Sequence, residues 1–380
     1  MAKIHITLVG GQSAPVYKGI IDEQPDKVVL VYSEESVTVA DNVRQYACKK
    51  IEGLQCEQVL MSTESISEIK EKIKDIASAV GSDDTVVVNI SGGTKVWSTL
   101  FYDFFKDKAE CIFIDQKDNK YDLRTGQTMK LDVDLGIKEV FGLNGINVTY
   151  HLLTEYTKED FEAAATARKM WQFSRSNFCQ LTLEAGKTPD AGYWSLEDKR
   201  NYLSWDGKDT YSLSLSRWDN SLMKKTIKSP HIHKVMSNYG WFELEVAKLL
   251  GEWGQPQQVA MNCNLSSSKK VNGPTLNEID IIVNVQSKLL FVECKTRIGE
   301  GKNSDATTID KFNNAIRNYG GLSAKGVFFT NGVMYGQAKA KCDAAGILTF
   351  GMQEIRRADR EGKKELFKTL SEHMDSTNIR

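Results

Sequence analysis

The stretch TVVVNISGGTK, residues 85–95, decides how the N-terminal part of the chain folds. Its first half is a nearly continuous run of Val and Ile, which is typical of a strand covered on both faces of a parallel sheet. Its second half brings two glycines, Thr94 and Lys95, which indicate a tight turn that leads into a helix. A buried strand followed by a turn and a helix is the repeating unit of a doubly wound α/β fold.

The same alternation continues on both sides of this stretch. Segments with helical spacing, such as SISEIKEKIKDIASAV at 65–80, separate short apolar runs. We expect strands at 4–9, 27–33, 56–61, 85–91 and 110–115. The sequence therefore predicts a Rossmann-like, doubly wound domain over residues 1–148.

The C-terminal part, residues 239–380, predicts a second α/β domain with a mixed sheet. A helix at 240–254 precedes three strands, of which the last two, EIDIIVNV and KLLFVECKT, are joined by a turn at Gln286 and Ser287. Helices and strands then alternate to the end. Residues 149–238 break this pattern, and we expect a helix, KEDFEAAATARKMWQF, followed by a connector and a small irregular or β-rich insertion.

Length and composition exclude several classes of protein. The 380 residues exceed the size at which one core stops growing, so two domains are expected. A net charge of -1 gives no overall field that would attract a polyanion, so any such site must be local. No apolar run reaches the roughly 20 residues of a membrane span, and the N-terminal run is too short for a signal peptide. Seven cysteines without a C-x-x-C indicate reduced thiols, and we expect a cytoplasmic protein without a membrane.

Charged residues interrupt the two apolar strands of the predicted hairpin. Glu293 and Lys295 share one face of their strand because side chains alternate, and the neighbouring strand carries Asp280 near its start. Inward charges of this kind are costly unless a metal or another charge compensates them. Two carboxylates suit a cation of the Mg or Mn type, with Glu243 or Glu245 of the preceding helix as a third. A surface hairpin with a cross-strand ion pair is the alternative explanation.

An acidic helix, then D, then E-x-K across a hairpin resembles the PD-(D/E)xK nuclease superfamily. The resemblance implies that Glu243, Asp280 and Glu293 hold the metal and that Lys295 joins them in catalysis. It departs from the motif in one respect, because an Ile rather than a Pro precedes Asp280. Cys294 points to the opposite side of its strand, and we assign it to the core.

Two glycine turns mark a candidate phosphate site in the first domain. Gly10 to Pro15 follows the first strand and Ser91 to Lys95 follows the fourth, and these strand ends are neighbours in the usual strand orders. Each turn opens a helix, whose free N–H groups attract phosphate. Neither a Walker loop nor a G-x-G-x-x-G is present, so the best evidence for a nucleoside triphosphate or NAD is missing. Ordinary tight turns, for which glycine suffices, are the alternative.

The pair of turns is similar to the CARF domain, the cyclic-oligoadenylate sensor of type III CRISPR immunity, and SGGTK is close to that family's signature. FGLNG at 141–145 also fits. The resemblance implies a ligand site formed by Gly10, Gly11, Gln12, Ser13, Ala14, Ser33, Ser91, Gly92, Gly93, Thr94 and Lys95.

A CARF domain followed by PD-(D/E)xK is the architecture of the CRISPR ancillary nucleases. It implies an activator such as cyclic tetra-adenylate, a Mg or Mn cofactor, a homodimer across the symmetric ligand, and RNA or single-stranded DNA as substrate, with duplex DNA left open. A CARF-containing regulator that only docks nucleic acid is the alternative, against which the intact Asp280, Glu293 and Lys295 argue. An enzyme acting on small nucleotides would need an acid or a His in the loops, which show none.

Two further features lie around the insertion. His231 and His233 have no flanking Cys or acid at metal-ligand spacing, so we expect a solvated loop there. The stretch 217–234 is rich in lysine and has Trp205, Tyr211 and Trp218 nearby. Basic residues beside aromatic platforms suit single-stranded nucleic acid, although a charge run is usually a solvated face.

Overall fold

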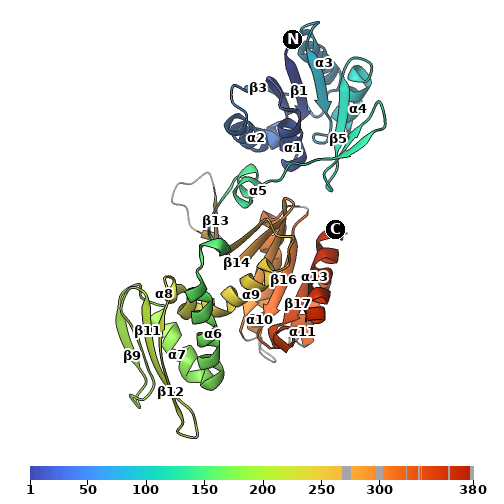
Figure 1. The fold of residues 1–380 in the computed structure, drawn as a ribbon. Coiled ribbons are helices and arrows are strands. Elements are labelled where there is room, and N and C mark those ends of the chain that lie inside the picture. Colours follow the sequence, from blue (N-terminus) through green and yellow to red (C-terminus); the bar gives the residue numbers. More distant parts are fainter. Residues whose placement is uncertain are drawn as a thin grey trace. The chain divides into compact units, whose positions relative to one another are not determined.

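The computed structural model describes residues 1–267, 275–296, 303–321, 323–332, 334, 336–357 and 360–376. It divides into two compact units, which are treated separately below (Figure 1). The first unit comprises Met1–Val148 with Ser266–Thr275, and the second comprises Thr149–Leu265 with Leu276–Arg380. No helix in the described ranges combines the length and apolar character needed to cross a bilayer.

A seven-stranded sheet forms the centre of the first unit, with the order β3-β2-β1-β4-β5-β6-β7. Its first five strands are parallel, and the order reverses between β1 and β4, as the sequence predicted. Beyond β5, β6 pairs antiparallel with β5 and β7 pairs antiparallel with β6; neither strand was expected, because NKYD and TMK are short and polar. The strands are β1 (Lys3–Leu8), β2 (Lys27–Tyr32), β3 (Gln55–Leu60), β4 (Thr85–Asn89), β5 (Glu110–Ile114), β6 (Asn119–Asp122) and β7 (Thr128–Lys130).

Helices cover both faces of this sheet (Figure 1). One apolar cluster packs α1 (Ala14–Glu23) and α2 (Val37–Lys50) on one face, together with Leu143 of α5 (Ile137–Leu143). A separate cluster packs α3 (Ile66–Ser78) and α4 (Lys95–Phe105) on the other face. The short helix η1 (Glu34–Ser36) follows β2. Because both faces are covered, the central strands β1, β2 and β4 are rich in apolar residues, which is why the fold class was readable from the sequence.

The second unit contains a mixed six-stranded sheet with the order β17-β16-β15-β14-β13-β8. Its β14 and β15 form the predicted antiparallel hairpin, and Gln286 and Ser287 both adopt positive φ values, 51° and 66°, as a tight hairpin turn requires. The strands β15, β16 and β17 are parallel. The bounds are β8 (Ile146–Leu152), β13 (Gln258–Ser267), β14 (Thr275–Val285), β15 (Lys288–Lys295), β16 (Lys325–Thr330) and β17 (Ile347–Gly351).

The helices of this unit follow the predicted order. On one face, Phe312 of α10 (Asn303–Tyr319) packs edge-on against Phe328 of the sheet, with ring centroids 5.8 Å apart. The other face belongs to a large apolar cluster that includes α9 (Gly240–Gly251), α12 (Met352–Arg357) and α13 (Arg360–Asp375). The helix α11 (Gly336–Ala344) precedes β17. The predicted terminal helix is thus two helices in the structure.

Residues between β8 and α9 fold into helices and a second sheet. The helix α6 (Lys158–Phe173) has the predicted bounds, and a capping box between Thr157 and Asp160 stabilises its start. The antiparallel sheet β12-β11-β10-β9 consists of β9 (Gly192–Ser195), β10 (Tyr202–Trp205), β11 (Thr210–Ser216) and β12 (Leu222–Lys228). The remaining elements are η2 (Leu153–Glu155), α7 (Arg175–Ala185), α8 (Ile232–Met236) and η3 (Ser237–Tyr239).

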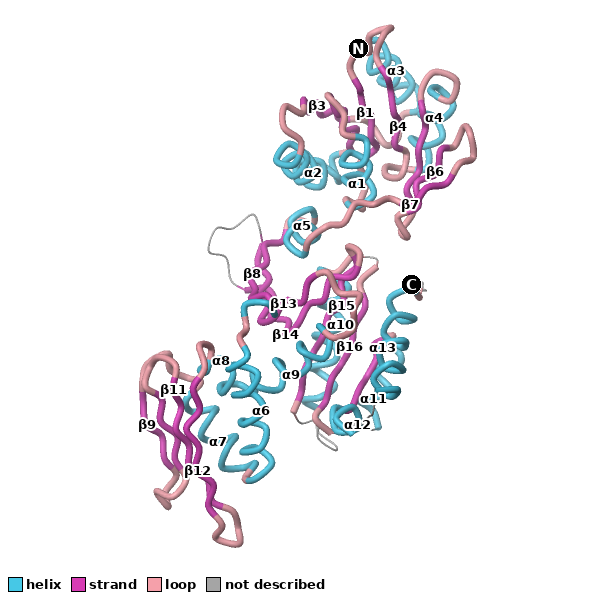
Figure 2. The backbone as a smooth tube through the Cα atoms, viewed as in Figure 1, coloured by secondary structure: helices cyan, strands magenta, loops and turns pink. Residues whose placement is uncertain are grey.

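This segment shares its core with the larger sheet. One cluster of buried side chains contains residues of α6, α7, β10 and β11 as well as residues of α9, β14 and β15. Figure 2 shows α6 and α7 lying against one side of the small sheet. The segment is therefore not a free linker. Its domain boundaries at 148 and 238 remain a prediction from the sequence.

Candidate active site and ligand loops

The two glycine turns of the first unit pack backbone against backbone. A Cβ atom on Gly92 would lie 2.1 Å from the carbonyl oxygen of Leu8, and one on Gly10 would lie 2.8 Å from the amide nitrogen of Gly93. Gly93 also has a φ of 72°, which a side chain disfavours. Glycine at these positions is therefore required by the close approach of the loops, and the predicted adjacency of the two turns is confirmed.

Two hydroxyl groups of the second turn form hydrogen bonds within the protein that stabilise the turn. The Ser91 hydroxyl donates to the Asn89 side chain and accepts the Ile114 N–H at 2.7 Å, which attaches the second turn to β5. The Thr94 hydroxyl accepts the Trp97 N–H at 3.1 Å and caps α4. Lys95, the first residue of α4, is exposed. Its ammonium thus places an exposed positive charge beside the turn.

The first turn connects to the FGLNG segment. Ser13 is buried, and its hydroxyl donates to the side-chain oxygen of Asn144 at 3.2 Å. Asn144 follows the last turn of α5 and caps it. This bond gives the predicted sequence feature a structural role, because it ties the end of α5 to the start of α1.

Ser33 lies in different surroundings from the other predicted ligand residues. It lines a pocket beyond the ends of β2 and β3 in which carboxylates outnumber the single cation, Lys72. The acidic residues of the pocket are Glu34, Glu35, Glu64, Glu68, Glu71 and Asp75. A polyanion is repelled there, so Ser33 is the least suitable of the predicted ligand contacts.

The hairpin of the second unit brings Asp280 and Glu293 opposite each other. The ladder pairs Ile281 with Val292, and its antiparallel register places the preceding residue, Asp280, across from Glu293. Asp280 is the sixth residue of an 11-residue strand, so its expected position near the strand start is wrong. The reason is that β14 begins earlier than the apolar run from which the strand was predicted.

Three contacts hold this pair. Asp280 Oδ2 accepts the backbone N–H of Cys294 at 2.6 Å, where the paired backbone ladder has ended. The Lys295 ammonium lies 2.6 Å from Glu293 Oε1 and 3.9 Å from Asp280 Oδ2. Cys294 is buried in the apolar cluster, as predicted. The three predicted groups of the hairpin therefore form one charged cluster.

Burial shapes the charges of this cluster. Burial and then the Asp280 charge raise the pKa of Glu293 to about 7, although Lys295 opposes the shift. Burial also raises the pKa of Asp280. Burial lowers the pKa of Lys295, but the carboxylates of Asp280 and Glu293 outweigh it and raise this pKa. Lys295 is thus a fixed positive charge at neutral pH.

The structure separates the two candidate helix acids. Glu245 is bonded by two arginines, since Arg168 and Arg356 both donate to its carboxylate, and Arg356 does so with two nitrogens. Glu243 instead accepts from Asn262 at 3.1 Å, and burial and then the Asp280 charge raise its pKa. Glu243 is the acid that interacts with the hairpin, whereas Glu245 forms a structural ion pair.

Two nearby residues were not predicted as part of the site. Glu278 lies two residues before Asp280 on β14, and its charge helps to raise the pKa of Glu243, Asp280 and Glu293. Asn262 of β13 adopts a φ of 51° and orients Glu243. The alternation of side chains along β14 could have indicated Glu278, but no sequence signal marks Asn262.

The donor set fits a hard divalent cation in its chemistry. Burial raises the pKa of the Glu243, Asp280 and Glu293 carboxylates, and the Asp280 charge raises those of Glu243 and Glu293 further, which is the electrostatic cost that a cation removes. Within the described ranges, however, no three acid, His or Cys side chains are positioned to hold a metal ion. Glu293 is turned to Lys295 instead. Metal binding therefore requires the carboxylates to rearrange around the ion.

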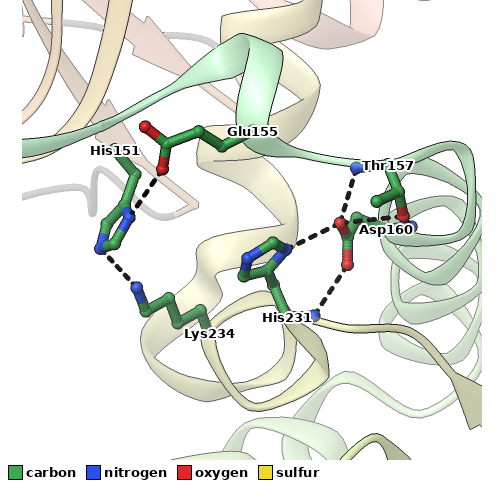
Figure 3. Close-up of polar contacts among 6 residues, drawn as sticks. All are labelled: His151, Glu155, Thr157, Asp160, His231 and Lys234. Atoms are coloured by element: carbon green, nitrogen blue, oxygen red, sulfur yellow. Dashed lines mark hydrogen bonds and ion pairs between the residues drawn. The ribbon is translucent and has the colours of Figure 1, made fainter.

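A second polar cluster lies near α9, and it corrects the expected loop at His231 (Figure 3). His231 precedes α8, and its Nδ1 lies 2.9 Å from Oδ2 of Asp160, whose other oxygen accepts the His231 N–H. Burial raises the pKa of Asp160, but these bonds and those from Thr157 outweigh it and lower the pKa to about 2. His233 stacks on Trp205 with centroids 4.0 Å apart. Both histidines are thus held by the protein and are not in a solvated loop.

This cluster adjoins the charged site through one residue. Tyr156 lies with its ring 4.9 Å from that of His231. Burial and then the Glu243 charge raise the pKa of Tyr156 to about 12. In the same cluster, His151 bonds Glu155 at 3.2 Å and accepts from Lys234 at 2.5 Å (Figure 3).

Fold and site together define a class of protein, namely a doubly wound ligand-binding domain joined to a nuclease-type domain with an acidic hairpin. Comparison with family models gives the family. Residues 4–141 match the Card1 CARF domain, and residues 232–360 match the Card1-like endonuclease domain. The chain therefore belongs to the Card1-like proteins, with a CARF domain followed by an endonuclease domain.

Solved structures share this architecture at low identity. Can2 from Sulfobacillus thermosulfidooxidans, solved in complex with cyclic tetra-adenylate, is 18% identical with a TM-score of 0.69, over 98% of this chain and 100% of that chain. Protein VC1899 from Vibrio cholerae is 13% identical with a TM-score of 0.73, over 98% of each chain. A type III CRISPR defence DNA nuclease activated by cyclic oligoadenylate is 16% identical with a TM-score of 0.56, over 86% of this chain and 45% of that one. The comparison with curated proteins gave no match.

Proposed function

We propose that the protein is a cyclic-oligoadenylate-activated, metal-dependent nuclease of type III CRISPR defence. One observation carries the nuclease assignment: Asp280 and Glu293 face each other, buried, at the end of the hairpin ladder, with Lys295 against Glu293. An ion pair on a surface hairpin would leave these carboxylates exposed, whereas their side chains are only 16% and 12% exposed. The match to an endonuclease domain over the same residues supports this assignment.

The activator binds in the first unit, at the two packed glycine turns. Their close approach leaves no room for side chains at Gly10, Gly92 and Gly93, so the backbone N–H groups of the turns, together with the side chains of Thr94 and Lys95, supply the contacts to phosphate. The complex of Can2 with cyclic tetra-adenylate supports a ring of that size for the activator. A ring with two-fold symmetry offers the same half-site twice, which favours a homodimer with one ligand on its axis.

Glu243, Asp280 and Glu293 would hold the cation, which is Mg or Mn. When bound, such a cation lowers the pKa of a water molecule and stabilises charge on the reacting phosphate. The chain's own groups prepare the site: the Cys294 N–H fixes the Asp280 carboxylate, and Asn262 orients Glu243. Lys295 keeps its proton and offers a positive charge to the phosphate oxygens.

The test combines activator, cation and substrate in one assay. Labelled RNA, single-stranded DNA and duplex DNA are incubated with the protein, with Mn or Mg, and with cyclic oligoadenylates of several ring sizes. We expect cleavage of RNA or single-stranded DNA only when both cation and activator are present. Binding of nucleic acid without cleavage under every condition would contradict the proposal and identify a regulator that only docks nucleic acid.

The homodimer is tested by mixing protomers. A heterodimer with one Lys95→Ala protomer should need more activator, even for cleavage by its unmutated nuclease domain. A ligand shifts the equilibrium between inactive and active conformations only by its differential affinity for the two, and a ligand that bridges both protomers loses part of that affinity when one Lys95 is removed. An unchanged activator requirement would show that the ligand does not bridge protomers.

A further inference from the structure

The small sheet of the second unit has one packed face and one open face. Along β10 and β11, Leu203, Trp205, Tyr211, Leu213 and Leu215 are buried and belong to the apolar cluster with α6 and α7. The residues between them point the other way, because side chains alternate along a strand. We call this opposite side the outer face; it is formed by Tyr193, Ser195, Tyr202, Ser204, Thr210, Ser212, Ser214, Ser216, Leu222, Lys224, Thr226 and Lys228.

Two rows of side chains cross the outer face, as the register shows. One row runs from Tyr193 through Ser204 and Ser212 to Thr226, and the hydroxyls of Ser212 and Thr226 lie 3.1 Å apart. The next row runs from Ser195 through Tyr202 and Ser214 to Lys224. Each row therefore begins near an aromatic residue, continues through hydroxyls and ends at the β12 edge, which carries the lysines.

The aromatic residues of the face form a platform. The rings of Tyr193 and Tyr202 are stacked, with centroids 5.5 Å apart and an interplanar angle of 25°. Tyr193 is 61% exposed. Of the aromatic residues that the sequence placed near the basic stretch, Trp205 and Tyr211 are instead buried on the opposite face. The exposed platform is thus made of residues that the sequence pattern did not single out.

The charge of the outer face is positive. Its twelve residues include two lysines and no acid, and Lys228 is partly neutralised by Asp209 at 3.3 Å. Lys224 is exposed and stands beside Ser214 in the register. Lys225, the next residue, lines a groove with Glu159 and Glu162, and Lys228 also borders this groove. Of the lysines of β12, Lys224 is therefore the one that lies away from these two carboxylates.

We propose that the outer face binds a single strand of nucleic acid, with bases stacked on Tyr193 and Tyr202 and phosphates at Lys224. The inference rests on the proposed nuclease function for the identity of the occupant. Stacked aromatic rings recognise unpaired bases, which a duplex keeps inside its own stack, and lysines beside them meet the phosphates. The partly exposed hydroxyls of Ser204 and Ser212 donate to phosphate or sugar oxygens, whereas the Ser214 hydroxyl is buried and donates to the Arg200 carbonyl at 2.8 Å. The surface extends substrate contact beyond the acidic hairpin.

The test measures binding without cleavage. Full-length protein is titrated into a fluorescent oligonucleotide in EDTA, with single-stranded RNA, single-stranded DNA and duplex compared. Because base–aromatic stacking is worth about 1–3 kcal/mol per base, Tyr193→Ala with Tyr202→Ala should weaken single-strand binding by roughly 10-fold or more. Tyr193→Phe with Tyr202→Phe should keep the parental affinity, because the rings remain. Quenching of 2-aminopurine in the strand should be lost only in the Ala variant.

Lys224 and Lys225 form a matched pair. Lys224→Ala should lower the salt dependence of binding by about one phosphate contact, a slope change of about 0.7, whereas Lys225→Ala should leave the slope unchanged. Equal effects of the two lysines, parental binding by the tyrosine-to-alanine variant, or weakened binding by the phenylalanine variant would overturn the inference. Parental binding would direct attention to a protein partner for this face.

The outcomes separate this inference from the proposed function. Single-strand binding that depends on the two tyrosines but never leads to cleavage would overturn the nuclease proposal and keep the inference. Activated cleavage that is unchanged by the tyrosine and Lys224 substitutions, together with unchanged binding, would keep the nuclease and overturn the inference.

Discussion

The glycine turns of the CARF domain and the hairpin of the endonuclease domain are both sites for phosphate chemistry, but they are built from different materials. The turns are formed by closely packed backbone atoms, because Gly92 and Gly10 lie so close to the facing loop that a side chain at either position would collide with it. The hairpin site is formed by charged side chains, since Asp280, Glu293 and Lys295 lie together where the ladder of backbone hydrogen bonds ends. Added bulk should therefore impair ligand binding at the turns, whereas removal of charge should impair cleavage at the hairpin.

The difference has a thermodynamic side. Closely packed turns stabilise the fold whether or not a ligand is bound, because the loops touch each other directly. Buried carboxylates destabilise the fold until something neutralises them, since burial and then the Asp280 charge raise the pKa of Glu243 and Glu293. Substitutions in the hairpin that preserve side-chain shape but remove charge should consequently abolish cleavage and leave the structure of the turns intact.

The largest expected effect is on cleavage. Glu293→Gln or Asp280→Asn keeps the shape of the side chain but removes a ligand of the cation, which supplies several kcal/mol of transition-state stabilisation, so activated cleavage should fall by about 1,000-fold. Initial rates with labelled substrate, saturating activator and Mn measure this. Activator binding, followed by calorimetry, should stay at the parental level.

Glu252→Gln is the matched control for these variants. Glu252 is an exposed carboxylate at the end of α9 that pairs with Lys363, and its removal should leave cleavage near the parental rate. Parental cleavage by Glu293→Gln or Asp280→Asn would remove the hairpin from the reaction.

The second prediction tests the steric character of the turns. Gly92→Ala places a Cβ atom against the Leu8 carbonyl, so the two loops must separate, at a cost of about 1–3 kcal/mol in the stability of the first unit. Activator affinity should fall by at least about 10-fold. Gly11→Ala is the control for stability, because a Cβ atom there meets no neighbour within 4 Å. Thermal melting compares the two variants, and calorimetry with cyclic tetra-adenylate compares Gly92→Ala with the parent; equal melting of the two variants or parental affinity of Gly92→Ala would show that loop contact does not shape the ligand site.

Much of the fold was predictable because burial leaves a strong pattern. Strands covered on both faces need apolar residues throughout, which marked β1, β2 and β4, and the hairpin turn at Gln286 and Ser287 was marked by its polar residues between two apolar runs. The charged residues inside the hairpin stood out for the same reason, since they interrupt that pattern. Burial explains why both the sheet and the candidate site could be located.

Other features depend on contacts that one sequence does not reveal. The edge strands β6 and β7 are held by strand pairing, β6 with β5 and β7 with β6, and not by their own composition. The choice between Glu243 and Glu245 depends on Arg168 and Arg356, which are distant in sequence. The same holds for His231, whose partner Asp160 lies 71 residues away. Partners of this kind are set by the tertiary fold.

The third prediction concerns Lys95, the charged residue of the turns. Lys95→Ala should weaken activator affinity by about 10- to 100-fold, because a charge-assisted bond to phosphate contributes ~1.5–3 kcal/mol. Lys106→Ala, at the far end of α4, is the control and should leave affinity unchanged, since Lys106 pairs with Asp103. Calorimetry measures both variants. An unchanged affinity in Lys95→Ala would place the activator away from this turn.

The last and smallest effect is on stability, and it follows from the buried carboxylates. Burial raises the pKa of Glu293 from 4.5 to about 7, so between these values the folded chain keeps a proton that the unfolded chain has lost. The folded state binds more protons there, and the free energy of unfolding should fall as the pH rises through this window. The Gln side chain of Glu293→Gln cannot ionise, so without divalent cation the free energy of unfolding of this variant should exceed that of the parent by about 1–3 kcal/mol at pH 8 but not at pH 4.5.

Urea unfolding in EDTA, followed by tryptophan fluorescence, measures this difference, because six of the seven tryptophans lie in the second unit. Mn should remove the difference by stabilising the parent alone, and Glu252→Gln should follow the parent at every pH. Identical pH dependence in Glu293→Gln and the parent would mean that Glu293 ionises as freely in the folded chain as in the unfolded one, and the hairpin would then lack the electrostatic cost that a cation is expected to offset.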